Sequence, residues 1–319
     1  MYKKCFTSLV ATLAVSAAVA QSYPSAKPIT LVVPNPPGGV VDTSARLMAD
    51  SLAKVLAQSV VVDNKGGASG NIAYQQVAKA PKDGYTLLAS YSAYHVGNPA
   101  MFAKLSWEQK ELAPVALIAV ATNVITTHPS IPATNLKELI AYIQKNPGKV
   151  NYASQGNGSL SHVGTALLEQ ETKTEMTHVP YKGSSPAITD VIAGQVQLMI
   201  GNLPPVLPHI KSGKVRALGV TTLTRFAATP DLPPISETVA GYESLAWFGL
   251  FAPAATPKDI VTKWHDDVVA ILALPDIRER VAQMGFDVVG NTPEAYAALV
   301  RSDIAKWQKV VKASGAKAD

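Results

Sequence analysis

Short β-branched runs alternate with helical patterns along most of the 319-residue chain. Because strands that alternate with helices are joined by crossovers, this pattern predicts an α/β fold with parallel sheets covered by helices. Eight runs have the length and composition of buried strands. They are ITLVV (29–33), SVVVDN (59–64), YTLLAS (85–90), VALIAV (115–120), VNYAS (150–154), MTHVPY (176–181), VQLMIG (196–201) and VRALGV (215–220).

Between these runs, apolar residues recur at helical spacing. Residues 135–148 predict a helix that ends at the sequence Asn146-Pro147-Gly148. The portion from Pro257 onward is almost purely helical in pattern. A further helix is predicted over residues 43–57, with one broad apolar face formed by Ala45, Leu47, Met48, Leu52, Val55 and Leu56.

Two apolar stretches, residues 115–130 and 242–257, have the pattern of crossings between two lobes. They predict a discontinuous first domain of residues 24–124 and 248–319, and a second domain of residues 125–247 inserted into it. Two connecting strands with a ligand between the lobes form a hinge-closing architecture. The alternative is one large α/β domain.

The first twenty residues have the features of a secretory signal peptide. Lys3 and Lys4 precede an apolar run that ends in Ala18-Val19-Ala20. The alternative, a membrane anchor, is disfavoured because the run is too short to span a bilayer. We therefore expect export to the periplasm with cleavage near Ala20, which removes the one cysteine, Cys5.

Charge excludes some classes of partner. Loss of Lys3 and Lys4 lowers the formal net charge from +5 to +3, since no acidic residue lies in the first twenty. The chain has no run of Lys or Arg of the kind that follows a nucleic-acid backbone, so we expect no nucleic-acid partner. A slight positive excess favours encounter with small anions.

The common catalytic signatures are missing from the sequence. It contains no nucleophile elbow, no phosphate-binding P-loop and no H-E-x-x-H helix. Its six histidines are scattered, with no pair at i and i+4, so we expect no metal site and no cofactor. Residues 156–161 (GNGSLS) follow a predicted strand as a dinucleotide fingerprint does, but a serine replaces the third glycine. A secreted hydrolase or NAD-dependent enzyme that uses this loop remains the alternative function.

Two glycine-bearing loops each end a predicted strand and begin a predicted helix. The first loop is PNPPGGVVD (34–42) and the second loop is SQGNGSLSH (154–162). The first turn of a helix carries unsatisfied N–H groups and the positive end of the dipole, which stabilise an anion. Both loops lack Lys and Arg, and neutral donors suit a small carboxylate that must be released again. Each loop alone is equally well explained as an ordinary Gly- and Pro-containing turn between a strand and a helix, with Asp42 as a helix N-cap.

These loops, with three other segments, resemble Bug-type receptors, the periplasmic solute-binding proteins of tripartite tricarboxylate transporters. The motifs are P-P-G-G-x-x-D, N-x-x-G-A-x-G-N-I, D-G-Y-T-L-L and V-P-Y-K-G, and the likeness covers nearly the whole chain from Pro28. The resemblance implies a type II-like periplasmic binding fold. Each lobe would be a mixed sheet flanked by helices, with the ligand cleft between the lobes. It also implies no catalysis, a carboxylate ligand and membrane permease subunits as partners, and we expect a monomer.

By position, the resemblance assigns Gly38, Gly39 and Asp42 to ligand binding in the first loop, and Ser154, Gly158 and Ser159 in the second. Tyr181 lies in a turn that the resemblance places near the cleft. Side-chain donors in the loops, Ser90 at the end of the third predicted strand and Tyr94 just after it complete the expected set. The ligand-binding residues are then Asn35, Gly38, Gly39, Asp42, Ser90, Tyr94, Ser154, Asn157, Gly158, Ser159, His162 and Tyr181.

Departures from the family pattern bear on the ligand. Val40-Val41 stands where family members commonly have small hydroxyl residues, and residues 201–204 replace a segment that often carries an acid. A missing acid disfavours a ligand ammonium, so we expect a di- or tricarboxylate or an aromatic carboxylate rather than an amino acid. Tyr91, Tyr94, Trp247 and Phe248 are the residues expected to supply a flat apolar wall.

Overall fold

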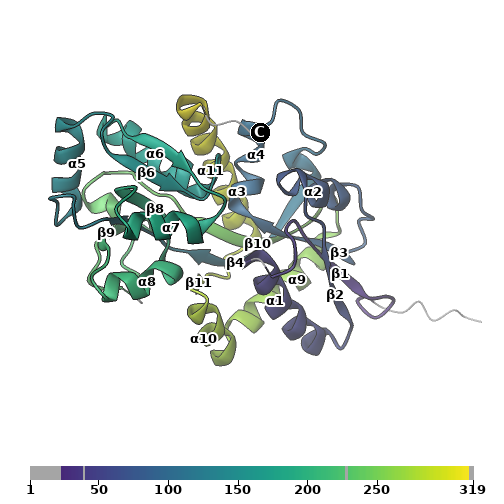
Figure 1. Cartoon of the computed structure of the whole chain (residues 1–319). Helices are drawn as coiled ribbons and strands as arrows, with labels where there is room; N and C mark the ends of the chain where they lie inside the picture. The colour runs from purple at the N-terminus through teal and green to yellow at the C-terminus, as the bar shows by residue number, and fades with distance from the viewer. Residues whose placement is uncertain (1–22, 39, 227–228, 316–319) are drawn as a thin grey trace, which may run out of the picture.

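Two mixed β-sheets flanked by helices form two lobes (Figure 1). The computed structural model describes residues 23–38, 40–226 and 229–315, so the predicted signal peptide and Gly39 lie outside the described residues. We call the two halves the six-strand lobe and the five-strand lobe. Their strand orders are β11-β4-β10-β3-β1-β2 and β7-β6-β8-β5-β9.

The six-strand lobe has a parallel half and an antiparallel half. Strand β1 is parallel to β2 and β3, whereas β10 is antiparallel to β3 and β4, and β11 is antiparallel to β4. The bounds are β1 (Ile29–Val33), β2 (Val60–Asn64), β3 (Thr86–Tyr91), β4 (Leu112–Ala121), β10 (Ala246–Pro253) and β11 (Phe286–Val288).

The five-strand lobe is mixed in the same way. Strand β6 is parallel to β7 and β8, and β5 is antiparallel to β8 and β9. The bounds are β5 (Asn123–Thr127), β6 (Asn151–Ser154), β7 (Thr177–Pro180), β8 (Leu198–Asn202) and β9 (Arg216–Val220).

All eight predicted strands are present, and each sheet is mixed, as the family resemblance implied, although the alternation of strands and helices by itself had indicated parallel sheets. Strand β10 re-enters the six-strand lobe from the other lobe and runs opposite to both of its neighbours. The prediction also missed β5, β10 and β11 as strands. Strands β5 and β10 lie inside the long apolar stretches 115–130 and 242–257, where a nearly continuous apolar run hides the ends of the strands. Strand β11 has only three residues, too few for a recognisable pattern.

Two connections join the lobes, and they are hydrogen-bonded to each other. The chain passes from β4 to β5 through Thr122, and returns between β9 and β10. The N–H of Asn123 donates to Oγ1 of Thr221 at 3.1 Å, and the N–H of Thr221 donates to the carbonyl of Asn123 at 3.0 Å. The division into domains at 124/125 and 247/248 stays a prediction.

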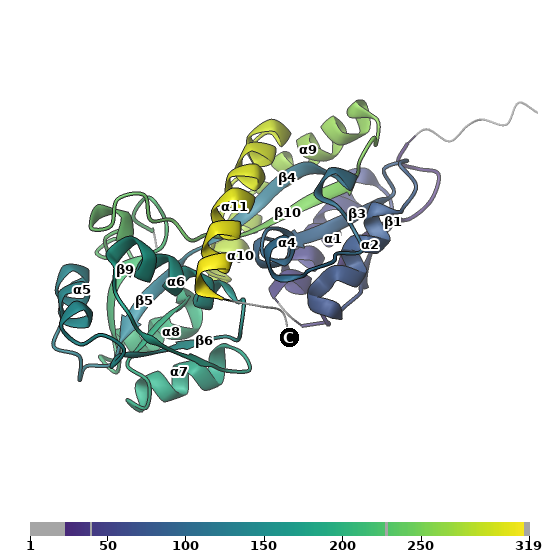
Figure 2. The same ribbon diagram turned by 90° about the horizontal axis from the view of Figure 1, so that it is seen from above.

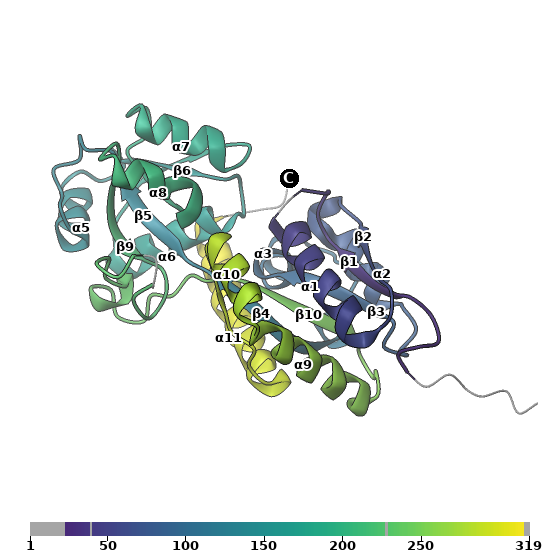
Figure 3. The ribbon, with the colours of Figure 1, turned by 90° about the horizontal axis from the view of Figure 1, so that it is seen from below.

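Helices cover both sheets, and the last one reaches across both lobes. Helix α11 packs against β4 in one lobe and against α6 in the other (Figure 2). Helices α1 and α9 lie side by side on the six-strand lobe (Figure 3). The helices of this lobe are α1 (Val40–Leu56), α2 (Asn71–Ala78), α3 (Ser92–His95), α4 (Asn98–Met101), α9 (Lys258–Leu272), α10 (Pro275–Gln283) and α11 (Pro293–Ser314). Those of the five-strand lobe are α5 (Leu136–Lys145), α6 (Leu160–Thr172), α7 (Ser184–Ile192) and α8 (Leu203–Lys211).

The buried face of α1 is narrower than the sequence pattern predicted. Ala45, Leu47, Met48 and Leu52 are buried against the sheet, as expected. Val55, however, is 50% exposed, so its place in the predicted face is wrong. It lies in the last turn of the helix, two residues before Ala57, where the backbone has a positive φ and the chain turns toward β2.

Candidate functional site

A cleft of about 540 Å³ is lined by residues from both lobes. None of its lining residues in the described part of the chain is Asp, Glu, Lys, Arg or His. The six-strand lobe contributes Asn35, Ser69, Tyr91, Tyr94, Asn98 and Met101. The five-strand lobe contributes Gln155, Asn157, Gly158, Ser159, Gly183 and Ser184. The described part of the lining therefore presents only neutral donors and apolar surface.

Helix N-termini compensate for the absence of cations at the cleft. Helix α6 begins at Leu160 and α7 begins at Ser184, and both of these residues line the cleft. Ser69 lies just before α2, which begins at Asn71. The first N–H groups of each helix have no intrahelical acceptor, and the dipole places partial positive charge there. An anion in the cleft is stabilised without a salt bridge.

The second loop is held in shape by its own hydroxyl groups. Ser159 is the N-cap of α6, and its Oγ donates to the carbonyl of Gly156 at 2.6 Å. Ser154 is fully buried, and its Oγ accepts the N–H of Gly156 at 3.2 Å. Gly156 and Gly158 have positive φ angles of 129° and 70°, which favour glycine.

Two stacked histidine rings support the second loop from behind. The Nδ1 atom of His162 accepts the N–H of Gly158 at 3.1 Å, and His178 Nε2 lies 2.6 Å from Ser154 Oγ. The two ring centroids are 3.9 Å apart. Burial, and then the neighbouring His178, lowers the pKa of His162 to about 4, so the ring is neutral at pH 7. His162 thus positions the loop and does not line the cleft.

Asp42 plays the same supporting part in the first loop. Its carboxylate is buried and accepts the N–H of Gly38 at 2.8 Å, the Nδ2 of Asn64 at 2.9 Å and the guanidinium of Arg46. Burial raises the pKa of Asp42, but these hydrogen bonds outweigh burial, so the pKa lies below its usual range. Asp42 and Gly38 lie outside the cleft lining, whereas Asn35 lines it.

The aromatic wall of the cleft is smaller than expected. Tyr91 and Tyr94 line the cleft edge to face, with ring centroids 5.7 Å apart. Phe248 is buried behind Tyr91, on which it stacks at 5.2 Å. Trp247 is fully buried, and its Nε1 donates to Asp303 at 2.8 Å. The expectation that Trp247 and Phe248 form the wall is therefore wrong, because both side chains point into the core.

Five of the predicted ligand-binding residues line the cleft: Asn35, Tyr94, Asn157, Gly158 and Ser159. Others are used elsewhere. Ser90 is buried and its Oγ lies 2.7 Å from the hydroxyl of Tyr74, and Tyr181 donates to Asp190 at 2.6 Å. Their direct contact with a ligand, like that of the lining residues, stays a prediction.

Sequence reasoning missed several lining residues. Ser69 and Gly183 lie inside motifs that carried the resemblance, N-x-x-G-A-x-G-N-I and V-P-Y-K-G, so a signal existed for them. Gln155 lies inside the second loop, and Ser184 directly follows the V-P-Y-K-G motif. Asn98 and Met101 lie on the short helix α4 and had no local signal, because only the packing of α4 brings them to the cleft.

Comparison with known proteins agrees with this fold. The family model described as tripartite tricarboxylate transporter family receptor matches residues 44–316. The chain belongs to this receptor family. Protein BugT from Bordetella pertussis is 36% identical over 314 residues, which cover 97% of this chain and 95% of BugT.

Solved structures of similar chains have the same two-lobed fold. The R. palustris protein Rpa4515, solved with adipate, is 37% identical with a TM-score of 0.77, covering 93% of this chain and 99% of its own. MatC from Rhodopseudomonas palustris, solved with bound malate, is 33% identical with a TM-score of 0.72, covering 90% and 99%. The Bug-type resemblance and the periplasmic binding protein fold are confirmed. This family and fold are those of solute-binding receptors, not of enzymes.

Among the residues that the structure describes, no helix is both long and apolar enough to cross a bilayer.

Proposed function

We propose that the protein is an exported receptor that captures a small organic dicarboxylate between its lobes. It would deliver this ligand to the membrane permease of a tripartite tricarboxylate transporter. The observation that carries the proposal is the cleft itself, where two helix N-termini and neutral donors converge and no described lining residue is charged. Relatives solved with adipate and malate support the ligand class.

The cleft accounts for binding and release together. Carboxylate oxygens accept from N–H groups at the start of α6 and α7 and from the amide of Asn157. Without Lys or Arg, the ligand carries no buried salt bridge whose rupture would slow its release. A ligand ammonium, in contrast, would find no carboxylate partner among the described residues of the cleft lining. Amino acids are therefore disfavoured.

Aliphatic dicarboxylates fit the cleft better than aromatic carboxylates. The sequence led us to expect four aromatic residues in a flat wall, but only Tyr91 and Tyr94 reach the cleft. Their rings meet edge to face, with an interplanar angle of 86°. Such a pair offers no continuous flat surface on which an aromatic ligand would stack.

Delivery requires that the permease distinguish the loaded receptor from the empty one. A ligand that contacts both lobes binds more tightly to the closed arrangement, and this difference shifts the population toward closure. The two connections between the lobes are hydrogen-bonded to each other through Asn123 and Thr221. Because they lie side by side, both can bend together and act as the hinge for closure. We expect the receptor to act as a monomer.

Thermal unfolding of the chain from Gln21 onward, refolded to remove any copurified ligand, tests the proposal. The panel holds adipate, malate, citrate, benzoate, phthalate, amino acids, sugars and NAD. A ligand at about 100 times its Kd adds about 2.7 kcal/mol of stability, which raises the midpoint by several degrees. We expect a shift with aliphatic dicarboxylates. No shift with any carboxylate, or a saturable shift with NAD, would favour the enzyme that uses residues 156–161.

A further inference from the structure

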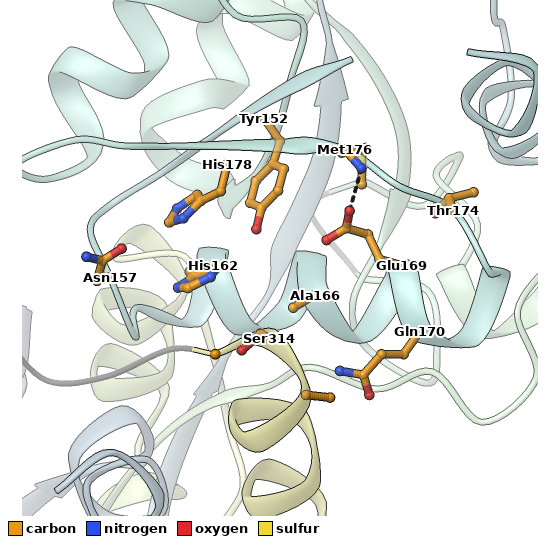
Figure 4. A pocket seen from close by; sticks show the side chains of 12 residues that line it. Tyr152, Asn157, His162, Ala166, Glu169, Gln170, Thr174, Met176, His178 and Ser314 are labelled. Atoms are coloured by element: carbon orange, nitrogen blue, oxygen red, sulfur yellow. Dashed lines mark hydrogen bonds between the residues drawn. The ribbon is translucent and has the colours of Figure 1, made fainter. Parts of the chain in front are cut away.

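A second cavity, of about 660 Å³, lies behind the second loop (Figure 4). Its walls are α6, the strands β6 and β7, and the C-terminal end of α11. Asn157 lines both this cavity and the cleft, but the other lining residues are distinct. The proposed carboxylate receptor makes no use of this space.

An acidic side chain without a cationic partner faces this cavity. One oxygen of Glu169 accepts the N–H of Met176 at 2.6 Å, and the other points into the open space (Figure 4). No Lys or Arg of the described residues forms an ion pair with it, and none lines the cavity. Burial, and then the nearby Glu175, raises the pKa of Glu169 to about 7. A cation beside this carboxylate would stabilise its charged form and so offset the cost of burying that charge.

Aromatic and hydroxyl groups next to Glu169 favour a cation as well. The hydroxyl of Tyr152 points into the cavity, and it makes no hydrogen bond to any residue in the described part of the chain (Figure 4). The Tyr152 ring stacks on His178 at 4.9 Å, and His178 stacks on His162. A phenol oxygen accepts hydrogen bonds, and aromatic rings attract cations.

The groups that line the cavity favour an organic cation over a metal ion or an anion. No group of three or more His, Cys, Asp or Glu side chains able to hold a metal ion occurs among the described residues. An anion would meet Glu169, and none of the described lining residues is a Lys or Arg that could balance it. An ammonium group has N–H donors for the one carboxylate and the one hydroxyl, and its carbon chain needs no further polar partner.

We propose that this cavity binds a small organic ammonium ion, held between the free oxygen of Glu169 and the hydroxyl of Tyr152. The site is additional to the carboxylate cleft and does not depend on it. The same two histidine rings form one wall of the cavity and contact Ser154 and Gly158 of the second loop. Occupation of the cavity is therefore expected to alter carboxylate affinity.

The test is a titration with n-propylammonium at about pH 8, where Glu169 is ionised, followed by saturation-transfer NMR and calorimetry. The neutral analogue 1-propanol has the same size and no charge. We expect saturable binding of propylammonium only. Binding of both compounds alike would show an apolar pocket and would overturn the proposal, as would no binding of either.

Variants locate the site. Glu169→Gln keeps an acceptor for the Met176 N–H but removes the charge, and we expect it to weaken propylammonium binding about tenfold or more. Tyr152→Phe is expected to weaken it severalfold. Glu171→Gln, an exposed residue on the same helix, is the matched control and is expected to change nothing. Equal affinity in Glu169→Gln and the wild-type protein would place any binding elsewhere.

The chain continues past Gly315 to Lys317, whose side chain also carries an ammonium group. The titration is therefore repeated with Lys317→Ala. Equal binding in this variant and the wild-type protein supports a free ligand. Binding that occurs only in Lys317→Ala would mean that the chain's own lysine competes for the site, and the proposal of a free organic ligand would be wrong. An adipate titration of every variant reports separately on the cleft.

Discussion

The Nδ1 atom of His162 accepts the backbone N–H of Gly158 at 3.1 Å, so one histidine ring holds the centre of the second loop. The same ring stacks on His178, whose Nε2 lies 2.6 Å from the Oγ of Ser154 at the start of that loop. The start and the centre of the loop thus depend on a pair of neutral imidazoles. A proton on His162 would replace an acceptor with a donor that faces the Gly158 N–H.

His162 should make both stability and binding sensitive to acid. Its pKa falls from 6.5 in the unfolded chain to about 4 in the folded protein, so the unfolded state takes up the proton first. The stability that the neutral ring contributes is present above pH 6.5 and is lost as the pH falls toward 4. His162→Asn keeps an acceptor and does not titrate. We expect its loss of stability between about pH 7 and pH 5 to be smaller by about 1–2 kcal/mol.

Urea unfolding at several pH values measures this difference, and adipate titrations show whether affinity follows. Other groups titrate in the same range. Glu169, with its pKa raised to about 7, acts in the opposite sense, because its stabilising protonated form is lost as the pH rises from 4.5 to 7. Comparison of the variant with the wild-type protein isolates His162. Equal pH slopes in the two proteins would show that the ring does not control the loop.

Asn157 is expected to contribute to affinity without contributing to stability. Its side chain lines the cleft and makes no hydrogen bond within the described part of the chain. Asn157→Ala should weaken adipate binding by about 1–3 kcal/mol, the value of a hydrogen bond to a charged group. Calorimetry measures this loss, with His265→Ala on α9 as a control that should leave affinity unchanged. A drop in unfolding temperature with unchanged affinity would contradict the assignment.

Gly158 is constrained by its backbone and by the opposite lobe. Its φ is 70°, and a Cβ at this position would collide with the sulfur of Met101. Gly213 has nearly the same φ, 71°, but a Cβ there would meet no atom within 4 Å. Both Gly158→Ala and Gly213→Ala should lose about 1 kcal/mol of stability from the left-handed backbone. Only Gly158→Ala should also lose adipate affinity. Equal affinity in the two variants would mean that the contact with Met101 does not shape the cleft.

Trp247 should matter for stability and not for binding. Its indole N–H donates to Asp303, which also pairs with Lys306 at 2.9 Å. Trp247→Phe leaves a buried carboxylate with one partner fewer, and we expect a loss of about 1–3 kcal/mol in the free energy of unfolding. Denaturant unfolding measures this loss, and adipate affinity should stay at the wild-type value. If the variant keeps full stability but loses adipate affinity, Trp247 contacts the ligand and the assignment to the core is wrong.

Local patterns predicted much of this molecule correctly. The β-branched runs located eight strands, because strand formation and side-chain alternation depend on neighbours in sequence. The glycine-bearing loops at 34–42 and 154–162 were correctly expected to lead into helices for the same reason, although α1 begins earlier than predicted, at Val40, and α6 begins at Leu160. Motifs spread along the chain also identified the receptor family.

What a side chain faces, in contrast, was decided by tertiary structure. Asp42 and His162 belong to the two loops, yet neither side chain lines the cleft. Asp42 turns inward because Arg46, Asn64 and the N–H of Gly38 supply its hydrogen-bond partners. His162 turns inward because it accepts the N–H of Gly158. Trp247 lies on β10, where the chain returns to the six-strand lobe, and its side chain is buried in the core because Asp303 of α11 accepts its indole N–H. These partners lie up to 56 residues away in sequence. The sequence by itself determined the elements, the loops and the family. The packing of distant segments decided which groups reach the cleft, because a buried polar group turns toward whatever partner the fold brings beside it.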